Sequence, residues 1–161
     1  MDQTLIINLA DAPAWSHPQQ GTDLVFEPKD QHWPDTGVNV QIMQPGQPNC
    51  LYHKEPVQED FLVLHGECIL IVDSEEKRLR QWDFVHCPAG VEHVFVGAGD
   101  GPCAVLMIGS RRDERAWYPV NEVAARHGAS AAAATGDPAV AYAEWEKQPF
   151  ERVENPWPLE G

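Results

Sequence analysis

The 161 residues fit one globular domain with extensions, since two full domains would each have too small a core. Twenty-five acidic residues against eleven basic ones give a net charge of −14. A surface of this sign repels phosphate groups, so neither nucleic acid nor an anionic membrane surface is expected as a partner. No apolar run approaches the roughly 20 residues that a membrane-spanning helix needs.

The first residues, MDQTLIINLADAP, lack the basic start and long apolar stretch of a secretory signal. A cytoplasmic protein is therefore expected. The four cysteines form no CxxC pair, which argues against a zinc ribbon or a dithiol redox motif. In a reducing compartment they are expected to be buried thiols.

Three segments follow one another along the chain. Residues 1–35 contain two short apolar runs separated by ADAPAWSHPQQGT, which is too rich in proline, glycine and polar residues for a helix, and we interpret them as an N-terminal arm. Residues 36–110 contain short β-rich runs with turn residues between them, a pattern that predicts an all-β sandwich or barrel. These runs are VNVQIMQ, CLYHK, DFLVLHG, ECILIVD, KRLRQWDFVH, HVFVG and CAVLMIG.

Within the barrel segment, ECILIVD and the start of KRLRQWD form a predicted hairpin across Asp73–Glu76. Several strands are apolar on both faces, which indicates that each is covered by the barrel interior on one side and by a sheet or neighbouring subunit on the other. Self-association is therefore expected. The side chains with the parity to face the interior are Gln41, Met43, Phe61, Val63, Phe95 and Met107.

Residues 111–161 form a predicted C-terminal helical extension followed by a proline-rich tail. Asn121 is a helix N-cap before EVAARH, and Gly128 is placed to end that helix in a left-handed conformation. Asp137 and Pro138 give a second start signal, a capping carboxylate followed by a first-turn proline. The tail KQPFERVENPWPLEG contains too much proline for a helix, so its aromatic residues need a surface to dock on.

Ionisable residues gather at the start of one apolar strand. His53, Glu55 and Glu59 directly precede or begin the run Phe61–Leu64, where burial is costly for such groups unless they are hydrogen-bonded or bound to a metal. His53 and Glu55 share a face if the segment is extended, and Glu59 can join them after a turn. About forty residues further on, a turn of proline and glycine is followed by His93 at the start of another apolar strand.

The spacing of these residues resembles the two signature motifs of the cupin superfamily. The first, G-x5-H-x-H-x3,4-E-x6-G, is matched by Gly46, His53, Glu59 and Gly66, with one extra residue after Gly46 and with Glu55 in place of the second histidine. The second, G-x5-P-x-G-x2-H-x3-N, is matched by Pro88, Gly90 and His93, whereas Trp82 replaces its first glycine and Gly97 its final asparagine.

The resemblance implies a small single-domain cupin of the cupin 2 type, a double-stranded β-helix or jelly-roll barrel. It also implies a divalent metal ion inside the barrel and a homodimer in which arms or added strands are exchanged. Carried over position by position, the metal ligands would be His53, Glu59 and His93, with Glu55 as a possible fourth.

Two imidazoles and one carboxylate suit Fe(II), and the same set accepts Mn, Ni or Zn. Glu55 would favour Mn(II) or Fe(II) if it is a ligand. Otherwise it could orient a bound water, act as a general base beside the metal, or remain a solvated carboxylate next to Lys54. The alternative for the whole group is a hydrogen-bonded polar cluster in a metal-free barrel.

The other histidines and cysteines are not expected to take part. His65 and His86 are interpreted as edge or turn residues, and Cys68 and Cys87 as inert thiols with no base nearby. Three functions stay open: a metal-dependent oxygenase, isomerase or lyase acting on a small molecule; a non-catalytic module that binds a metal or small ligand; and a storage or scaffold role.

Overall fold

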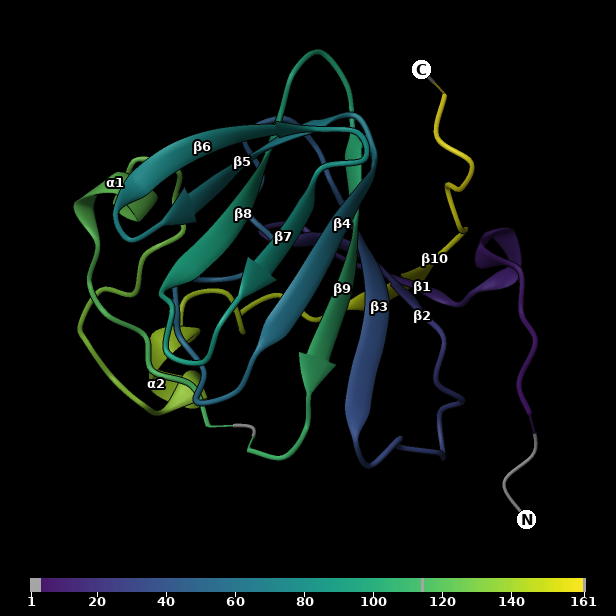
Figure 1. The fold of residues 1–161 in the computed structure, drawn as a ribbon, viewed down its shortest axis with the longest axis horizontal. Coiled ribbons are helices and arrows are strands. Elements are labelled where there is room, and N and C mark those ends of the chain that lie inside the picture. The colour runs from purple at the N-terminus through teal and green to yellow at the C-terminus, as the bar shows by residue number, and fades with distance from the viewer. Residues whose placement is uncertain (1–3, 114, 161) are drawn as a thin grey trace.

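The computed structural model describes residues 4–113 and 115–160, and within them two antiparallel β-sheets face each other (Figure 1). The larger sheet has seven strands in the order β10 (Glu151–Val153), β1 (Ala14–His17), β2 (Gly21–Val25), β3 (Thr36–Met43), β9 (Cys103–Ser110), β4 (Glu59–His65) and β7 (Phe84–Cys87). The smaller has β6 (Glu75–Arg80), β5 (Glu67–Val72) and β8 (His93–Ala98). The predicted all-β, double-stranded β-helix is confirmed.

The main core lies between the two sheets. Its side chains come from alternating positions of the strands, because a strand presents every second residue to the same face. Met43, Phe61, Val63, Phe95 and Met107, all predicted to face the interior, belong to this cluster. Cys68, Cys87 and Cys103 lie there too as buried free thiols, in agreement with the sequence.

The outer faces of the apolar strands are covered by the chain's own extensions. On the large sheet, Val40 and Ile42 pack with Leu9 from the N-terminal region and with Trp157 and Leu159 from the tail. On the small sheet, Ile71 and Val94 pack with Tyr52 and with Ala124 and Ala129 of the C-terminal segment. The chain's own N-terminal and C-terminal segments therefore cover the second apolar face of these strands.

The segment read as an N-terminal arm contributes two strands to the large sheet. Trp15 in β1 pairs with Asp23 in β2 on one side and with Arg152 in β10 on the other. Beyond β2, a loop returns to β3, and Glu27 and Arg111 join the loop to the end of β9. The pairing of β1 with β10 places the N-terminal and C-terminal regions of the chain side by side (Figure 1).

Two runs expected to be strands differ in the structure. CLYHK is not a strand: it makes isolated bridges, His53 with His93 and Lys54 with Trp117. KRLRQWDFVH is not one strand, because Trp82 adopts φ 74° and separates β6 from β7. The hairpin of β5 and β6 is confirmed, with Glu67 opposite Arg80 and Val72 opposite Glu75.

Two short helices, α1 (Glu122–Ala125) and α2 (Pro138–Ala141), follow the barrel and lie beside the small sheet in Figure 1. Both predicted caps are present: the Asn121 side chain accepts a hydrogen bond from the Ala124 amide, and Asp137 accepts one from Ala139. Gly128 has φ 68°, as its helix-ending role requires. None of the described helices is long and apolar enough to cross a membrane.

Candidate metal centre

The three predicted ligands come from three different parts of the chain. Glu59 begins β4 in the large sheet, and His93 begins β8 in the small sheet. His53 lies in the segment before β4 and forms a two-way backbone bridge with His93: the His93 amide donates to the His53 carbonyl at 2.8 Å, and the His53 amide donates back at 3.2 Å. This bridge brings the two histidines together although forty residues separate them in sequence.

The side chains of these three residues converge. Each of His53, Glu59 and His93 offers one ligand atom, and the three atoms lie within 4.8 Å of one another. Nε2 of His93 is 3.3 Å from a carboxylate oxygen of Glu59, and the two imidazole ring centres are 5.0 Å apart. All three are buried or half-buried, and no other such group occurs among the described residues.

Backbone carbonyls fix the tautomer of both histidines. Nδ1 of His53 donates to the Leu51 carbonyl at 2.9 Å, and Nδ1 of His93 donates to the Val91 carbonyl at 3.1 Å. A proton on Nδ1 leaves the lone pair on Nε2 free for a metal, and a carbonyl acceptor is a common partner of metal-binding histidines. The donor set and its orientation therefore fit a divalent cation.

The electrostatics of the site favour a cation. Burial lowers the pKa of His53 to about 4, with the neighbouring His93 adding to the effect. Burial also lowers the pKa of His93, so both rings are neutral near pH 7. Burial and, to a smaller extent, the neighbouring Glu55 carboxylate together raise the pKa of Glu59 to about 8. Neutral imidazoles and a carboxyl that resists ionisation are the groups that a bound cation would compensate.

Glu55 lies beside this group without belonging to it. Its Oε1 is 3.8 Å from Nε2 of His53, which is beyond hydrogen-bond length. Its side chain, like that of Glu59, lines a cavity of about 460 Å³ at the open end of the barrel. The placement puts a carboxylate next to the candidate metal centre and in contact with the space that a small molecule would occupy.

The C-terminal extension binds the segment that carries His53. The Leu51 amide donates to the Tyr142 hydroxyl at 3.0 Å, so the peptide unit next to the His53 acceptor is fixed from outside the barrel. The Tyr52 amide donates to the Ala129 carbonyl, and Lys54 and Trp117 exchange hydrogen bonds in both directions. A segment that lacks regular strand pairing is held in place by these contacts.

Aromatic rings and a thiol complete the surroundings of His53. The Tyr118 ring lies 6.0 Å from the His53 ring, and burial raises the pKa of the Tyr118 hydroxyl to about 12. Sγ of Cys50 is 3.5 Å from Nδ1 of His53, and burial raises the pKa of this thiol well above its ordinary value. The thiol is therefore un-ionised and serves as a second, weak partner of the ring.

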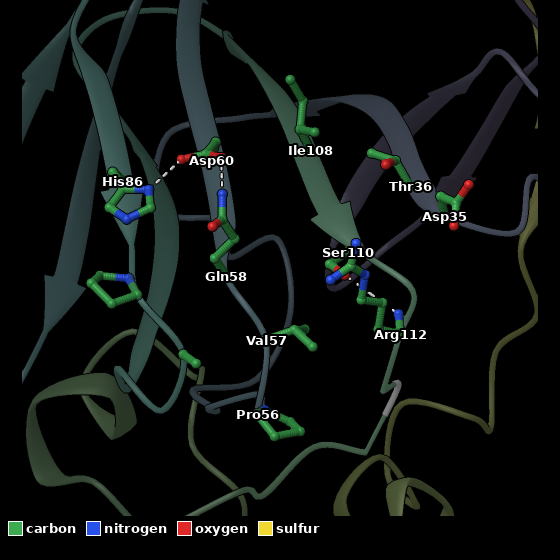
Figure 2. Close-up of a pocket in the computed structure, with 12 residues that line it drawn as sticks. Asp35, Thr36, Pro56, Val57, Gln58, Asp60, His86, Ile108, Ser110 and Arg112 are labelled. Atoms are coloured by element: carbon green, nitrogen blue, oxygen red, sulfur yellow. Dashed lines mark hydrogen bonds and ion pairs between the residues drawn. The ribbon is translucent and has the colours of Figure 1, made fainter.

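A larger cavity, about 610 Å³, lies on the other face of the large sheet and does not contain the metal group. Figure 2 shows His86 and Asp60 pointing toward each other there, with Nδ1 of His86 2.6 Å from the Asp60 carboxylate. Asp60 follows Glu59 in β4, so the two carboxylates point to opposite faces of the strand. His86 is thus kept away from the candidate metal centre.

Sequence analysis missed several residues around the centre. Tyr118 reaches the His53 ring, and Tyr142 reaches the neighbouring Leu51 amide, only through tertiary structure. Cys50 is three residues from His53, but without regular strand pairing its contact with the ring was not expected. Asp23 was missed for another reason: β2 lies in the region interpreted as an arm. An acidic residue within the alternating run GTDLV was the available signal that one face of this strand meets a polar space.

The comparisons with known proteins agree with this architecture. Residues 39–109 match the Cupin domain family. The chain therefore contains a cupin domain of the cupin 2 type, as the motifs predicted, and both bridged histidines and Glu59 fall within it. No curated protein matches the chain by sequence.

Solved structures show the same fold at low sequence identity. The polyketide cyclase RemF from Streptomyces resistomycificus is 14% identical with a TM-score of 0.61, over 71% of this chain and 84% of that one. A sugar phosphate isomerase of the cupin superfamily from Silicibacter pomeroyi is 24% identical with a TM-score of 0.57, over 66% and 76%. A cupin 2 domain-containing protein from Halorhodospira halophila is 22% identical with a TM-score of 0.53, over 67% and 74%. These likenesses establish the fold.

Proposed function

We propose that the protein is a metal-dependent enzyme that binds one divalent ion through His53, Glu59 and His93 and acts on a small molecule in the adjoining cavity. The observation that supports the metal most directly is the convergence of two Nε2 atoms and a carboxylate, with both Nδ1 positions already taken by carbonyls. The polyketide cyclase and the sugar phosphate isomerase are enzymes with the same fold, and this likeness supports a catalytic role for the barrel.

Fe, Mn, Ni and Zn all accept this donor set. Such an ion would act as a Lewis acid on an oxygen of the small molecule, or in the case of iron support oxygenase chemistry. The chain's own residues would do the rest. Buried strands β4 and β8 fix two of the ligands, and Glu55, which faces the same cavity, would accept or return a proton on the bound molecule.

A non-catalytic role in binding or sensing is the second candidate. It is favoured by one observation: the group that converges among the described residues consists of three metal-ligand candidates, His53, Glu59 and His93, and binding a cation needs no more than these. Such a module would hold a metal or a small ligand without turnover.

The first experiment is elemental analysis of purified protein. We expect near one equivalent of Fe, Mn, Ni or Zn in the wild type and loss of it in the His53→Ala, His93→Ala double variant, because a single carboxylate cannot hold the ion alone. The matched control is the His65→Ala, His86→Ala double variant, which removes two histidines outside the centre and should keep the metal.

The outcome for Glu55 separates its possible roles. Glu55→Gln should keep near one equivalent of metal if the residue is a base, and should lose most of it if the residue is a ligand. A wild type that takes up no metal after reconstitution, or a control double variant that loses metal as the first one does, would contradict the proposal and leave a polar cluster in a metal-free barrel.

A further inference from the structure

We infer that the cavity beside the metal centre accepts uncharged or cationic small molecules that donate hydrogen bonds, and that it rejects anions such as phosphates and carboxylates. This inference rests on the proposed function and names the substrate class of the same site. It comes from the side chains that line the cavity.

The lining is rich in carboxylates. Asp23 from β2, Glu55 from the segment before β4 and Glu59 at the start of β4 all contribute to the cavity wall. A divalent ion on Glu59 and the two neutral histidines offsets two of these three charges. A net negative charge therefore faces a bound molecule even in the metal-loaded protein.

The cation in the described lining is already used. Arg111 donates to both oxygens of Glu27, with Nη2 to Oε2 at 3.0 Å, and also to the Trp33 carbonyl at 2.8 Å. This pairing lowers the pKa of Glu27, so the ion pair is intact at neutral pH. A phosphate or carboxylate entering the cavity would have to compete with a bidentate carboxylate for this guanidinium.

The polar groups of the wall mainly accept hydrogen bonds. Asp23 accepts a bond from the Asn39 amide at 2.9 Å, which directs the amide protons of Asn39 toward the wall. Val25 and Met107 add apolar surface. A ligand that suits this wall therefore offers hydroxyl or amino donors together with an apolar portion.

Small residues leave the space open. In the register of the large sheet, Gly109 of β9 lies between Gly37 of β3 and Glu59 of β4. A Cβ atom at Gly109 would meet nothing within 4 Å, so a larger side chain there would project into the cavity without distorting the strand. Gly109→Val is consequently a variant that narrows the cavity and replaces none of the metal ligands.

The test uses Mn²⁺-loaded protein and three probes of nearly equal shape: benzamidine, benzamide and benzoate. Paramagnetic broadening of the ring-proton signals reports binding next to the ion. We expect the wild type to bind benzamidine and benzamide about tenfold more tightly than benzoate, since a carboxylate a few ångströms from another costs several-fold in affinity in a partly solvated site. Gly109→Val should weaken binding of all three probes while the Mn²⁺ content stays the same.

Charge variants supply the matched comparison. Asp23→Asn should tighten benzoate binding about fivefold and leave benzamide nearly unchanged. Asp100→Asn makes the same chemical change in the exposed turn at the far end of β9 and should affect neither probe.

Each other outcome overturns the inference. Benzoate binding as tightly as benzamide to the wild type would show that the wall accepts anions. Failure of benzamide and benzamidine to bind Mn²⁺-loaded protein would show that the cavity does not select such molecules, while the metal centre would stand. Absence of bound Mn²⁺ in the wild type would remove the metal centre and this inference together.

Discussion

At the scale of single residues, Asp23 shows how the fold tolerates a carboxylate in a poorly solvated place. Burial raises its pKa to about 6, although the hydrogen bond from Asn39 opposes the shift. The folded state therefore binds a proton more tightly than the unfolded chain does. Ionisation of Asp23 destabilises the fold, and this loss of stability develops as the pH rises from about 4 to about 6.

Replacing Asp23 with asparagine should stabilise metal-free protein at pH 7. The amide cannot ionise, and its oxygen can still accept the bond from Asn39. We expect the free energy of unfolding to rise by about 1–2 kcal/mol at pH 7 and not to change below pH 4. The gain at pH 7 is smaller than the full pKa difference would give, because the side chain is only half-buried. Urea unfolding of both proteins between pH 4 and pH 8 measures the difference. A gain that is independent of pH would show that charge burial is not its cause.

The convergence of His53, Glu59 and His93 was predictable from sequence because these residues are set by local spacing within two motifs. Departures from the motifs were harder to interpret. Gly97 replaces the usual asparagine, and the structure gives the reason: a Cβ atom there would lie 2.2 Å from the Gln44 carbonyl oxygen. The Gly46 amide donates to the Gly97 carbonyl in the same contact. Such a close approach between two backbones is a tertiary fact that a single sequence does not contain.

At the scale of elements, the segment Cys50–Lys54 shows where sequence patterns stop being informative. Its alternation predicts a strand, but its backbone partners are the C-terminal extension and His93 in place of a regular neighbour. The strands of the predicted arm were not expected for a related reason: β1 and β2 are short, and β3 and the tail lie on either side of them as partners. Strand identity in both cases depends on partners distant in sequence.

The hydroxyl of Tyr142 is expected to position His53. Tyr142→Phe leaves the Leu51 amide without its acceptor, and the adjacent carbonyl that fixes His53 loses its support. Removal of partners outside the ligand shell commonly lowers metal affinity by about 10–100-fold, and we expect the low end of this range. Competition with a chelator of known affinity measures the effect.

Tyr52→Phe is the matched control for this prediction. The Tyr52 hydroxyl also accepts a hydrogen bond from a backbone amide, that of Ser74 at 3.2 Å. Ser74 lies in the turn between β5 and β6, so this bond does not hold the carbonyl that fixes His53. Both variants should lower the melting temperature to a similar extent, whereas only Tyr142→Phe should weaken metal binding. Equal losses of affinity would indicate general destabilisation instead of positioning.

At the scale of the whole molecule, the N-terminal and C-terminal extensions cover the outer faces of the two sheets of the barrel. The N-terminal region and the tail share the large sheet, and the helical segment closes the small one. The homodimer expected from the sequence stays a prediction. We expect its interface near β7, where the large apolar residues Trp82 and Phe84 are 65% and 64% exposed.

The backbone bridge between His53 and His93 and the position of Glu59 link metal binding to the opening motion of the two sheets. Glu59 belongs to the large sheet and His93 to the small one, so an ion bound to both would join the sheets at the open end of the barrel. The amide protons of His53 and His93 should then exchange with deuterium more slowly in metal-loaded protein than after chelation, by at least about tenfold. Exchange in β1 and β10, which lie at the opposite edge of the large sheet from β4, should change little. Uniform slowing throughout the chain would instead mean that the ion stabilises the fold as a whole. Equal exchange in the metal-loaded and chelated forms would mean that the sheets do not separate at this end.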